Sequence, residues 1–292
     1  MFNEKSILHR IKTRLKQDFD IILGEGLKKT TGSLFRTAML ETLPIRFTVM
    51  SLNLWADNRM PDRTESIQKL LCLHQPDILC LQELRATTRD LIDQTLSNHG
   101  RVDDPFAGWI GEGNIYFNSE MFELNQYGAE DIGMYEADRR LFWSRLSLKG
   151  KKNLQFLVAT AHYTWSGNPT ERDGGISPRY HQAQETVRML AEITNQDEPL
   201  LFMGDLNDYV HPIRILREAG FVDSFSGLGR TSPITIPAMP TAKGTPQTID
   251  WIFHKGALQP MTSEVVDFFA GDIAPSDHKP VLATYSISGQ KL

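Results

Sequence analysis

Short apolar runs separated by polar turns make up most of the chain from about residue 45 onward. Some of these runs are continuous, as in strands that are buried on both faces, and others alternate or repeat at helical spacing. Pro-Asp and glycine-containing segments mark the turns between them. The pattern predicts strands over residues 46–54, 76–83, 113–117, 142–148, 154–161, 200–203, 249–253 and 281–285, and helices over residues 66–73 and 180–193.

Strands and helices alternate along this part of the chain. This order, with both continuous and alternating strands, predicts an α/β fold that contains a mixed, buried sheet. The sequence shows no internal repeat, low-complexity tract or linker after residue 45. We therefore expect one domain over residues 45–292.

Residues 1–44 have a different pattern. Apolar residues at positions 7, 8, 11, 15, 19 and 22 follow a helical period with lysines and arginines between them, and glycines at 24, 26 and 32 end it. The pattern predicts a helical N-terminal extension over residues 1–44. Two roles remain open for it: packing on the main domain, or contact of residues 1–22 with an anionic membrane or a nucleic-acid backbone.

Charge and cysteine content narrow the function classes. The net charge is −5, and because residues 1–46 carry +4, the remainder carries −9. An acidic body argues against tight binding of duplex nucleic acid, but it suits an enzyme whose carboxylates hold a divalent metal. The sequence has no apolar run that could span a bilayer and no secretory h-region, and it has only two cysteines, Cys72 and Cys80. These features predict a reduced, cytoplasmic protein.

Polar side chains that can bind a metal or transfer a proton lie at the ends of the predicted strands. Because ligands of α/β sheets bind at strand ends, we expect these side chains to form one site. Carboxylates, amides and imidazoles in such a site are suited to metal-assisted attack on phosphate. The candidates are Asn53, Glu83, His162, Asp205, Asn207, Asp250, Asp277 and His278.

The segments that carry these residues resemble, in order, the motifs of the endonuclease/exonuclease/phosphatase superfamily, the DNase I-like group. The resemblance covers about residues 46–286. The motifs are Ser51-Leu52-Asn53-Leu54-Trp55, Leu81-Gln82-Glu83, Thr160-Ala161-His162, Gly204-Asp205-Leu206-Asn207, Ile249-Asp250-Trp251 and Ser276-Asp277-His278.

The resemblance implies a four-layer α/β/β/α sandwich in which two mixed β-sheets face each other. It also implies hydrolysis of a phosphoester by directly attacking water, with Mg²⁺ or Mn²⁺ as cofactor. Glu83 is then the main metal ligand, with Asn53 beside it and Asp277 as a direct or water-mediated contact.

The same resemblance assigns the other roles. Asp205 positions or deprotonates the water, and Asn207 donates to a phosphate oxygen. His278 stabilises the charge on the phosphoryl group while Asp250 orients its imidazole, and His162 faces the same phosphate from the other sheet.

Each residue also has a plainer interpretation. Asp205 and Asn207 are candidates to cap a helix that begins near Pro212. Glu83 alone is compatible with a solvated strand end, and His162 with a hydrogen-bonded core residue. One departure from the superfamily pattern matters: Trp55 stands where some of its nucleases have a second acidic ligand, so we expect a single metal.

The substrate class stays open at this level. A long polar loop over residues 165–178 contains Arg172, and Arg179 follows directly after the loop. Both arginines are candidates for phosphate contact or for surface positions. Three aromatic side chains, Trp109, Tyr163 and Trp165, are candidates to stack on bases. We expect a phosphodiester in a single-stranded nucleic acid or a nucleotide, with an inositide- or sphingomyelin-type phospholipid and a non-catalytic scaffold as alternatives.

Overall fold

A computed structural model describes residues 44–287, and the side chain of residue 152 is left out of the description. The N-terminal extension expected over residues 1–44, and its membrane or nucleic-acid contact, therefore lie almost wholly outside the described residues and stay predictions. In the described part of the chain, no helix is long and apolar enough to cross a membrane.

Two six-stranded sheets form the centre of the fold. The first has the order β11-β12-β1-β2-β4-β3, in which β1 pairs in parallel with β2 and antiparallel with β12. Its strands are β1 (Ile45–Asn53), β2 (Ile78–Gln82), β3 (His99–Arg101), β4 (Gly113–Asn118), β11 (Leu258–Val265) and β12 (Val281–Ile287).

The second sheet has the order β5-β6-β7-β8-β10-β9, with β7 and β8 parallel and the other pairs antiparallel. Both sheets are therefore mixed, as predicted. The strands are β5 (Phe122–Glu130), β6 (Leu141–Leu148), β7 (Lys151–His162), β8 (Leu200–Asp205), β9 (Val222–Asp223) and β10 (Asp250–Lys255).

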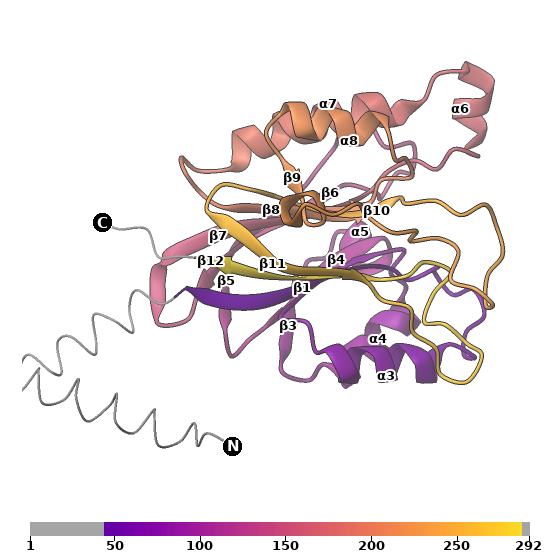
Figure 1. Ribbon diagram of the computed structural model, residues 1–292, viewed down its shortest axis with the longest axis horizontal. Helices are drawn as coiled ribbons and strands as arrows, with labels where there is room; N and C mark the ends of the chain where they lie inside the picture. Colours follow the sequence, from indigo (N-terminus) through magenta and orange to yellow (C-terminus); the bar gives the residue numbers. More distant parts are fainter. Residues whose placement is uncertain (1–43, 288–292) are drawn as a thin grey trace, which may run out of the picture. The chain divides into compact units, whose positions relative to one another are not determined.

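Helices cover the outer face of each sheet (Figure 1). Helices α3 (Thr64–His74) and α4 (Ala86–Thr95) pack on the first sheet through Ile67, Leu70 and Ile92. On the second sheet lie α7 (Pro178–Ile193) and α8 (His211–Glu218), which contribute Leu190 and Leu216. Three short helical segments, α5 (Ala107–Gly111), α6 (Pro169–Gly174) and η1 (Ser226–Leu228), complete the elements. The four-layer sandwich expected from the sequence is confirmed.

The largest apolar cluster lies between the two sheets. Phe47 of β1 stacks on Phe156 of β7 with ring centroids 5.3 Å apart. Because side chains alternate along a strand, every second residue of β1, β2, β7, β8 and β10 points into this cluster, and the residues between point toward the helices. The polar residues at the strand ends continue the same alternation, so their side chains also point between the two sheets, where the site described below lies.

Four strands, β3, β5, β9 and β11, were not predicted from the sequence, and neither were helix α4 and the short helical segments. β3 and β9 are only three and two residues long. β5 and β11 are polar on one face, and β11 contains a proline beside a register shift, so neither has a clear apolar signal. Helix α4 buries only Thr88, Leu91 and Ile92. The polar segment over residues 165–178 also contains the short helix α6, where a loop was expected.

Candidate active site

Four polar residues lie at strand ends on the face of each strand that points between the sheets. Asn53 continues the inward-facing series of β1, and His162 does the same on β7. Asp205 ends β8 and Asp250 begins β10, in both cases in step with inward-facing apolar neighbours. Three of these strands are adjacent in one sheet and the fourth belongs to the other. The fold thus gathers the four side chains at one edge of the gap between the sheets.

Asp205 lies at the centre of this edge. It is paired in register with His162 on one side and with Asp250 on the other. Asp205 is 1% exposed, and its Oδ1 accepts a hydrogen bond from the backbone amide of Asn207 at 2.9 Å. Gly204 allows β8 to approach β7 here, because a Cβ at this position would lie 2.0 Å from the carbonyl oxygen of Ala161.

Asn53 joins the two sheets at the site. Its Nδ2 donates to Asp205 Oδ2 at 3.0 Å and to Glu83 Oε1 at 3.2 Å. Its Oδ1 accepts from the backbone amide of Trp55, which fixes the orientation of the amide group. Glu83, Asn207 and Trp55 all have positive φ, at 53°, 48° and 58°. Backbone strain of this kind concentrates at functional sites, where the surrounding structure holds side chains in required positions.

His278 and Asp250 form a buried pair. The Nδ1 of His278 lies 2.9 Å and 3.1 Å from the two carboxylate oxygens of Asp250, so this nitrogen carries the proton of the hydrogen bond. The opposite ring nitrogen, Nε2, faces the carboxylates of Asp205 at 3.8 Å and Asp277 at 3.9 Å. This arrangement presents Nε2 to whatever binds between these groups.

The protonation states follow from burial and charge. Burial raises the pKa of Asp205 to about 7, with a further contribution from the nearby carboxylate of Asp250. Burial alone would lower the pKa of His278, but Asp250 and Asp205 outweigh it and raise this pKa well above its usual value. Asp205 and His278 together therefore offer a carboxylate that exchanges a proton near neutral pH beside an imidazolium.

His162 is the neutral imidazole of the site. Burial, together with the positive charges of Arg139, His278 and Arg85, lowers its pKa well below the usual value. Its Nε2 lies 3.4 Å from Asp205 Oδ2 and 4.0 Å from Glu83 Oε1. Its Nδ1 is buried and has no hydrogen-bond partner in the described part of the chain.

Asn207 and Asp277 have contacts of their own beside these groups. One amide proton of Asn207 is donated to the backbone oxygen of Tyr163 at 2.9 Å, which leaves the second for another acceptor. Asp277 precedes His278, and its Oδ1 accepts from Ser276 Oγ at 3.2 Å. Burial and the Glu83 carboxylate raise the pKa of Asp277. All eight residues named from the sequence thus lie around one centre.

The donor set suits a hard divalent cation. Glu83 and Asp277 repel each other, and neither forms an ion pair with a lysine or arginine among residues 44–287. Carboxylate and amide oxygens are the ligands that Mg²⁺ and Mn²⁺ prefer. Ligand atoms of Asp205, Asp250 and His278 also lie within 4.8 Å of one another. Of these two groups we take Glu83 with Asp277 as the metal ligands, because Asp250 already accepts a hydrogen bond from His278 Nδ1.

Arg63 is a buried residue that the sequence did not single out. Its guanidinium donates four hydrogen bonds to backbone oxygens. The acceptors are the carbonyls of Leu54, Ala56 and Asn58 after β1 and of Pro275 before the Ser-Asp-His segment. It is fully buried and interacts electrostatically with Asp277 and Glu83. Arg63 therefore holds the loop that follows Asn53 against the loop that carries His278.

We expect replacement of Arg63 by methionine to lower the free energy of unfolding by about 3–5 kcal/mol, because four backbone carbonyls lose their donor and two of these hydrogen bonds are fully buried. Urea unfolding followed by circular dichroism measures this change. Arg59→Met, in the same loop but with a partly exposed side chain, is the control and should cost less than about 1 kcal/mol. A similar small cost for both variants would contradict the role given to Arg63.

The structure places several other candidates away from the reaction centre. Trp109 is 2% exposed and Tyr163 is fully buried, so the prediction that they stack on bases is wrong; they fill apolar clusters instead. Trp165 is 51% exposed and remains available. Arg179 is buried and bonded to Glu171 through both terminal nitrogens, whereas Arg172 is exposed.

The alternative that Asp205 and Asn207 cap a helix is wrong. Helix α8 begins at His211, and the side chain that accepts from the amides of Val210 and His211 is that of Asp208. The carboxylate of Asp205 and the side-chain amide of Asn207 have the other partners described above. Their contacts are those of the site and not of a helix N-terminus.

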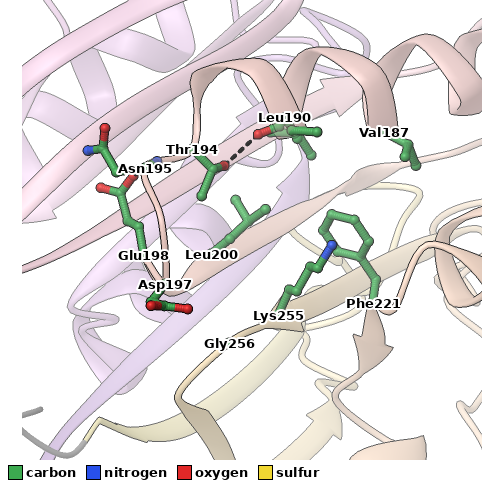
Figure 2. Close-up of a pocket in the computed structure, with 11 residues that line it drawn as sticks. Val187, Leu190, Thr194, Asn195, Asp197, Glu198, Leu200, Phe221, Lys255 and Gly256 are labelled. Carbon is green, nitrogen blue, oxygen red and sulfur yellow. Dashed lines mark hydrogen bonds between the residues drawn. The ribbon is translucent and has the colours of Figure 1, made fainter.

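A cavity of about 370 Å³ lies at the opposite end of β8 from Asp205 (Figure 2). It is lined by the last turns of α7, the start of β8 and the turn after β10. Lys255 at its edge donates to the carbonyl of Ala219 and lies over the Phe221 ring. The cavity contains none of the eight candidate residues and does not contribute to the site.

Comparisons with known structures and families agree with this geometry. Solved structures with a similar fold include Danio rerio TDP2 in complex with a single-strand DNA product, at 16% identity and a TM-score of 0.66 over 82% of this chain and 98% of that one. The human Nocturnin catalytic domain with bound sulfate shares 21% identity, with a TM-score of 0.66 over 84% and 94%. A mannosyl-6-phosphatase from Bacteroides thetaiotaomicron shares 18%, with a TM-score of 0.66 over 82% and 99%.

At these identities the structural likeness shows the fold. Comparison with curated proteins gives no significant match. The family profile is the decisive result, because it matches residues 50–278 and thus all eight candidate residues. The chain belongs to the Endonuclease/Exonuclease/phosphatase family.

Proposed function

We propose that the protein is a divalent-metal-dependent phosphoesterase that hydrolyses a phosphodiester by direct attack of an activated water. The observation that carries this proposal is the arrangement around Asp205. A buried carboxylate with a pKa of about 7 lies between a neutral imidazole and an imidazolium, next to an Asn-Glu pair with ligand character. Membership of the family supports the same reaction class.

Glu83, with Asn53 and Asp277, would hold Mg²⁺ or Mn²⁺. A bound divalent cation there supplies Lewis-acid polarisation of the phosphoryl oxygen. Asp205 accepts the proton of the attacking water, because its pKa lies near neutral pH and Asn53 and the Asn207 amide fix its orientation. The water is thereby directed toward the phosphorus atom.

His278 stabilises the negative charge that grows on the phosphoryl oxygens. Its proton on Nδ1 is held by Asp250, so Nε2 donates its own proton toward the substrate. The second amide proton of Asn207 and the ring of His162 complete the set of groups around the phosphate. These roles need no covalent intermediate.

A protein nucleophile does not fit this site. Burial raises the pKa of Cys80 and keeps its thiol protonated, while Cys72 is on the exposed side of α3. The buried hydroxyl of Ser276 is engaged with Asp277 and the His278 amide. Both cysteines are unpaired, as expected in a reducing compartment, and a cytoplasmic location is part of the proposal.

We infer that the substrate is a single-stranded nucleic acid or a nucleotide. Trp165 lies three residues after His162 and exposes half its surface, which suits stacking on a base. A protein of the same fold was solved with a single-strand DNA product. Another is named a phosphatase, so the fold itself does not decide between diester and monoester.

A metal-supplemented substrate screen tests the proposal. With Mg²⁺ or Mn²⁺, we expect hydrolysis of bis-p-nitrophenyl phosphate and of short single-stranded oligonucleotides, and little hydrolysis of p-nitrophenyl phosphate. Asp205→Asn serves as the blank, and EDTA should abolish turnover. Selective hydrolysis of an inositol phospholipid or sphingomyelin would establish the phospholipid alternative instead. No turnover of any phosphoester would favour a scaffold.

A further inference from the structure

Two arginines and a glutamate lie beside the catalytic groups, where the two sheets meet. Arg85 lies two residues after Glu83, in the turn between β2 and α4, and Arg139 lies two residues before β6. Glu112 lies between them, with its Oε2 3.1 Å from Arg139 Nε and its Oε1 3.5 Å from Arg85 Nη1. The positive charge of both arginines reaches His162 and contributes to its lowered pKa. The cluster therefore borders the phosphate-binding centre and is oriented by protein contacts.

Arg139 is buried with its hydrogen-bonding capacity unfilled. Its side chain is 10% exposed, yet Nη1 has no hydrogen-bond partner among residues 44–287 and lies 3.6 Å from Glu136 Oε1. A guanidinium loses solvation on burial, and leaving a buried donor without an acceptor costs free energy. An acceptor supplied by a ligand would satisfy Nη1.

Two buried arginines with structural roles, Arg63 and Arg145, differ from Arg139. All three guanidinium nitrogens of Arg63 donate to backbone oxygens. Those of Arg145 donate to side-chain oxygens of Glu198 and Gln126 and to the backbone oxygen of Ile193. A further buried arginine, Arg179, also has one nitrogen without a hydrogen-bond partner, Nε, but its two terminal nitrogens bind Glu171. Arg139 combines an unpartnered buried terminal nitrogen with a charge that reaches His162, and this combination points to a ligand.

We propose that Arg139, with Arg85, forms a subsite for a second phosphate group of the substrate, next to the phosphate that is hydrolysed. The guanidinium of Arg139 is held by a hydrogen bond to Glu112 and lies within ion-pair distance of Glu136. Its orientation is therefore fixed, and the planar fork of N–H donors matches phosphate oxygens. The same chemistry fits a neighbouring phosphate of an oligonucleotide or the second phosphate of a pyrophosphate-linked dinucleotide. The inference rests on the proposed phosphodiesterase activity and names what its substrate carries.

The test compares substrates that differ only in the neighbouring charge. Tetranucleotides with phosphate or with neutral methylphosphonate on either side of the central linkage serve as probes, and a dinucleoside pyrophosphate tests the second source. We expect the wild-type protein to favour the charged tetranucleotide by ~10–100-fold in kcat/KM, the range that a charge-assisted hydrogen bond supplies. Arg139→Gln and Arg85→Gln should remove most of this ratio. Each ratio is taken within one variant, so partial loss of folded protein cancels.

Arg140→Gln is the matched control. Arg140 is adjacent and partly exposed, and it donates to backbone oxygens of Ala137 and Arg139. Its charged-to-neutral ratio should equal that of the wild type. An unchanged ratio in Arg139→Gln, or the same loss in Arg140→Gln, overturns the subsite.

A binding measurement separates failure of the subsite from failure of the proposed function. The Asp205→Asn protein and its double variant with Arg139→Gln are titrated with both fluorescent tetranucleotides, without any turnover. A ratio of Kd values that Arg139→Gln abolishes supports the subsite even if the wild type hydrolyses neither probe. Equal Kd values for the two probes in Asp205→Asn contradict it, whatever the activity.

Discussion

Replacing Asp205 by asparagine should make the metal-free protein more stable while it removes most of the activity. We expect kcat on bis-p-nitrophenyl phosphate to fall by about 10³-fold or more, the scale of a lost general base. We also expect the free energy of unfolding at pH 8, in EDTA, to rise by about 1–3 kcal/mol. Opposite signs for activity and stability would mark this residue as retained for chemistry.

The sign of the stability effect follows from linkage. Burial and the Asp250 charge raise the folded-state pKa of Asp205 to about 7, whereas an unfolded aspartate titrates at about 3.9. The contribution of this group to stability is therefore full below pH ~4 and is lost as the pH rises through about 7. Asparagine does not titrate, so the advantage of the variant should grow between these pH values and level off above them.

Urea unfolding of both proteins across pH 4–9 measures this difference. Asp173→Asn is the control, because Asp173 is exposed in the short helix α6 and its replacement should change the curve little. If Asp205→Asn is less stable than the wild type at pH 8 by as much as at pH 5, the carboxylate is not under the electrostatic stress described here.

Replacing Glu83 by glutamine should abolish the response of the protein to divalent metal. A cation that binds only the folded state at 100 times its Kd stabilises by about 2.7 kcal/mol. We expect Mg²⁺ or Mn²⁺ to raise the melting temperature of the wild type and to leave that of Glu83→Gln nearly unchanged. Turnover should fall by about 10³-fold, because several kcal/mol of transition-state stabilisation depend on the held cation.

Differential scanning calorimetry with and without metal measures the effect. Glu120→Gln is the matched control, since Glu120 is an exposed glutamate in a turn remote from the site in sequence. Metal stabilisation that survives in Glu83→Gln but is lost in Asp250→Asn would place the cation among Asp205, Asp250 and His278 instead. Both outcomes can be read without a substrate.

The parts of the fold that were predicted are those with a strong one-dimensional signal. β1, β2, β7 and β8 lie in the middle of their sheets, where both faces are covered, and their buried stretches are mostly apolar. β5 is an edge strand that exposes much of one side, so its composition resembles that of a loop. Helix α4 is polar for the same reason, because it buries few of its side chains.

The candidate site divides in a similar way. Residues at the ends of apolar strands stand out, because a carboxylate directly after a buried run needs a reason. The buried arginines do not stand out: Arg63 and Arg139 lie in polar segments, where an arginine usually faces water. Only the fold shows that Arg63 is surrounded by carbonyls and that Arg139 borders His162. The opposite error concerned Trp109 and Tyr163, whose large rings carry no sign in the sequence of which face they occupy.

The pairing of β1 with β12 has a consequence for the order of events during synthesis. β1 ends at Asn53, and its antiparallel neighbour begins only at Val281, directly after the Ser-Asp-His segment (Figure 1). While the ribosome makes the intervening residues, one edge of β1 has no native partner, and pairing over so long a separation is slow. His278 reaches Asp250 only when that edge closes. A chain that lacks β12 therefore also lacks the assembled His278–Asp250 pair, and the proposed hydrolysis requires the finished fold.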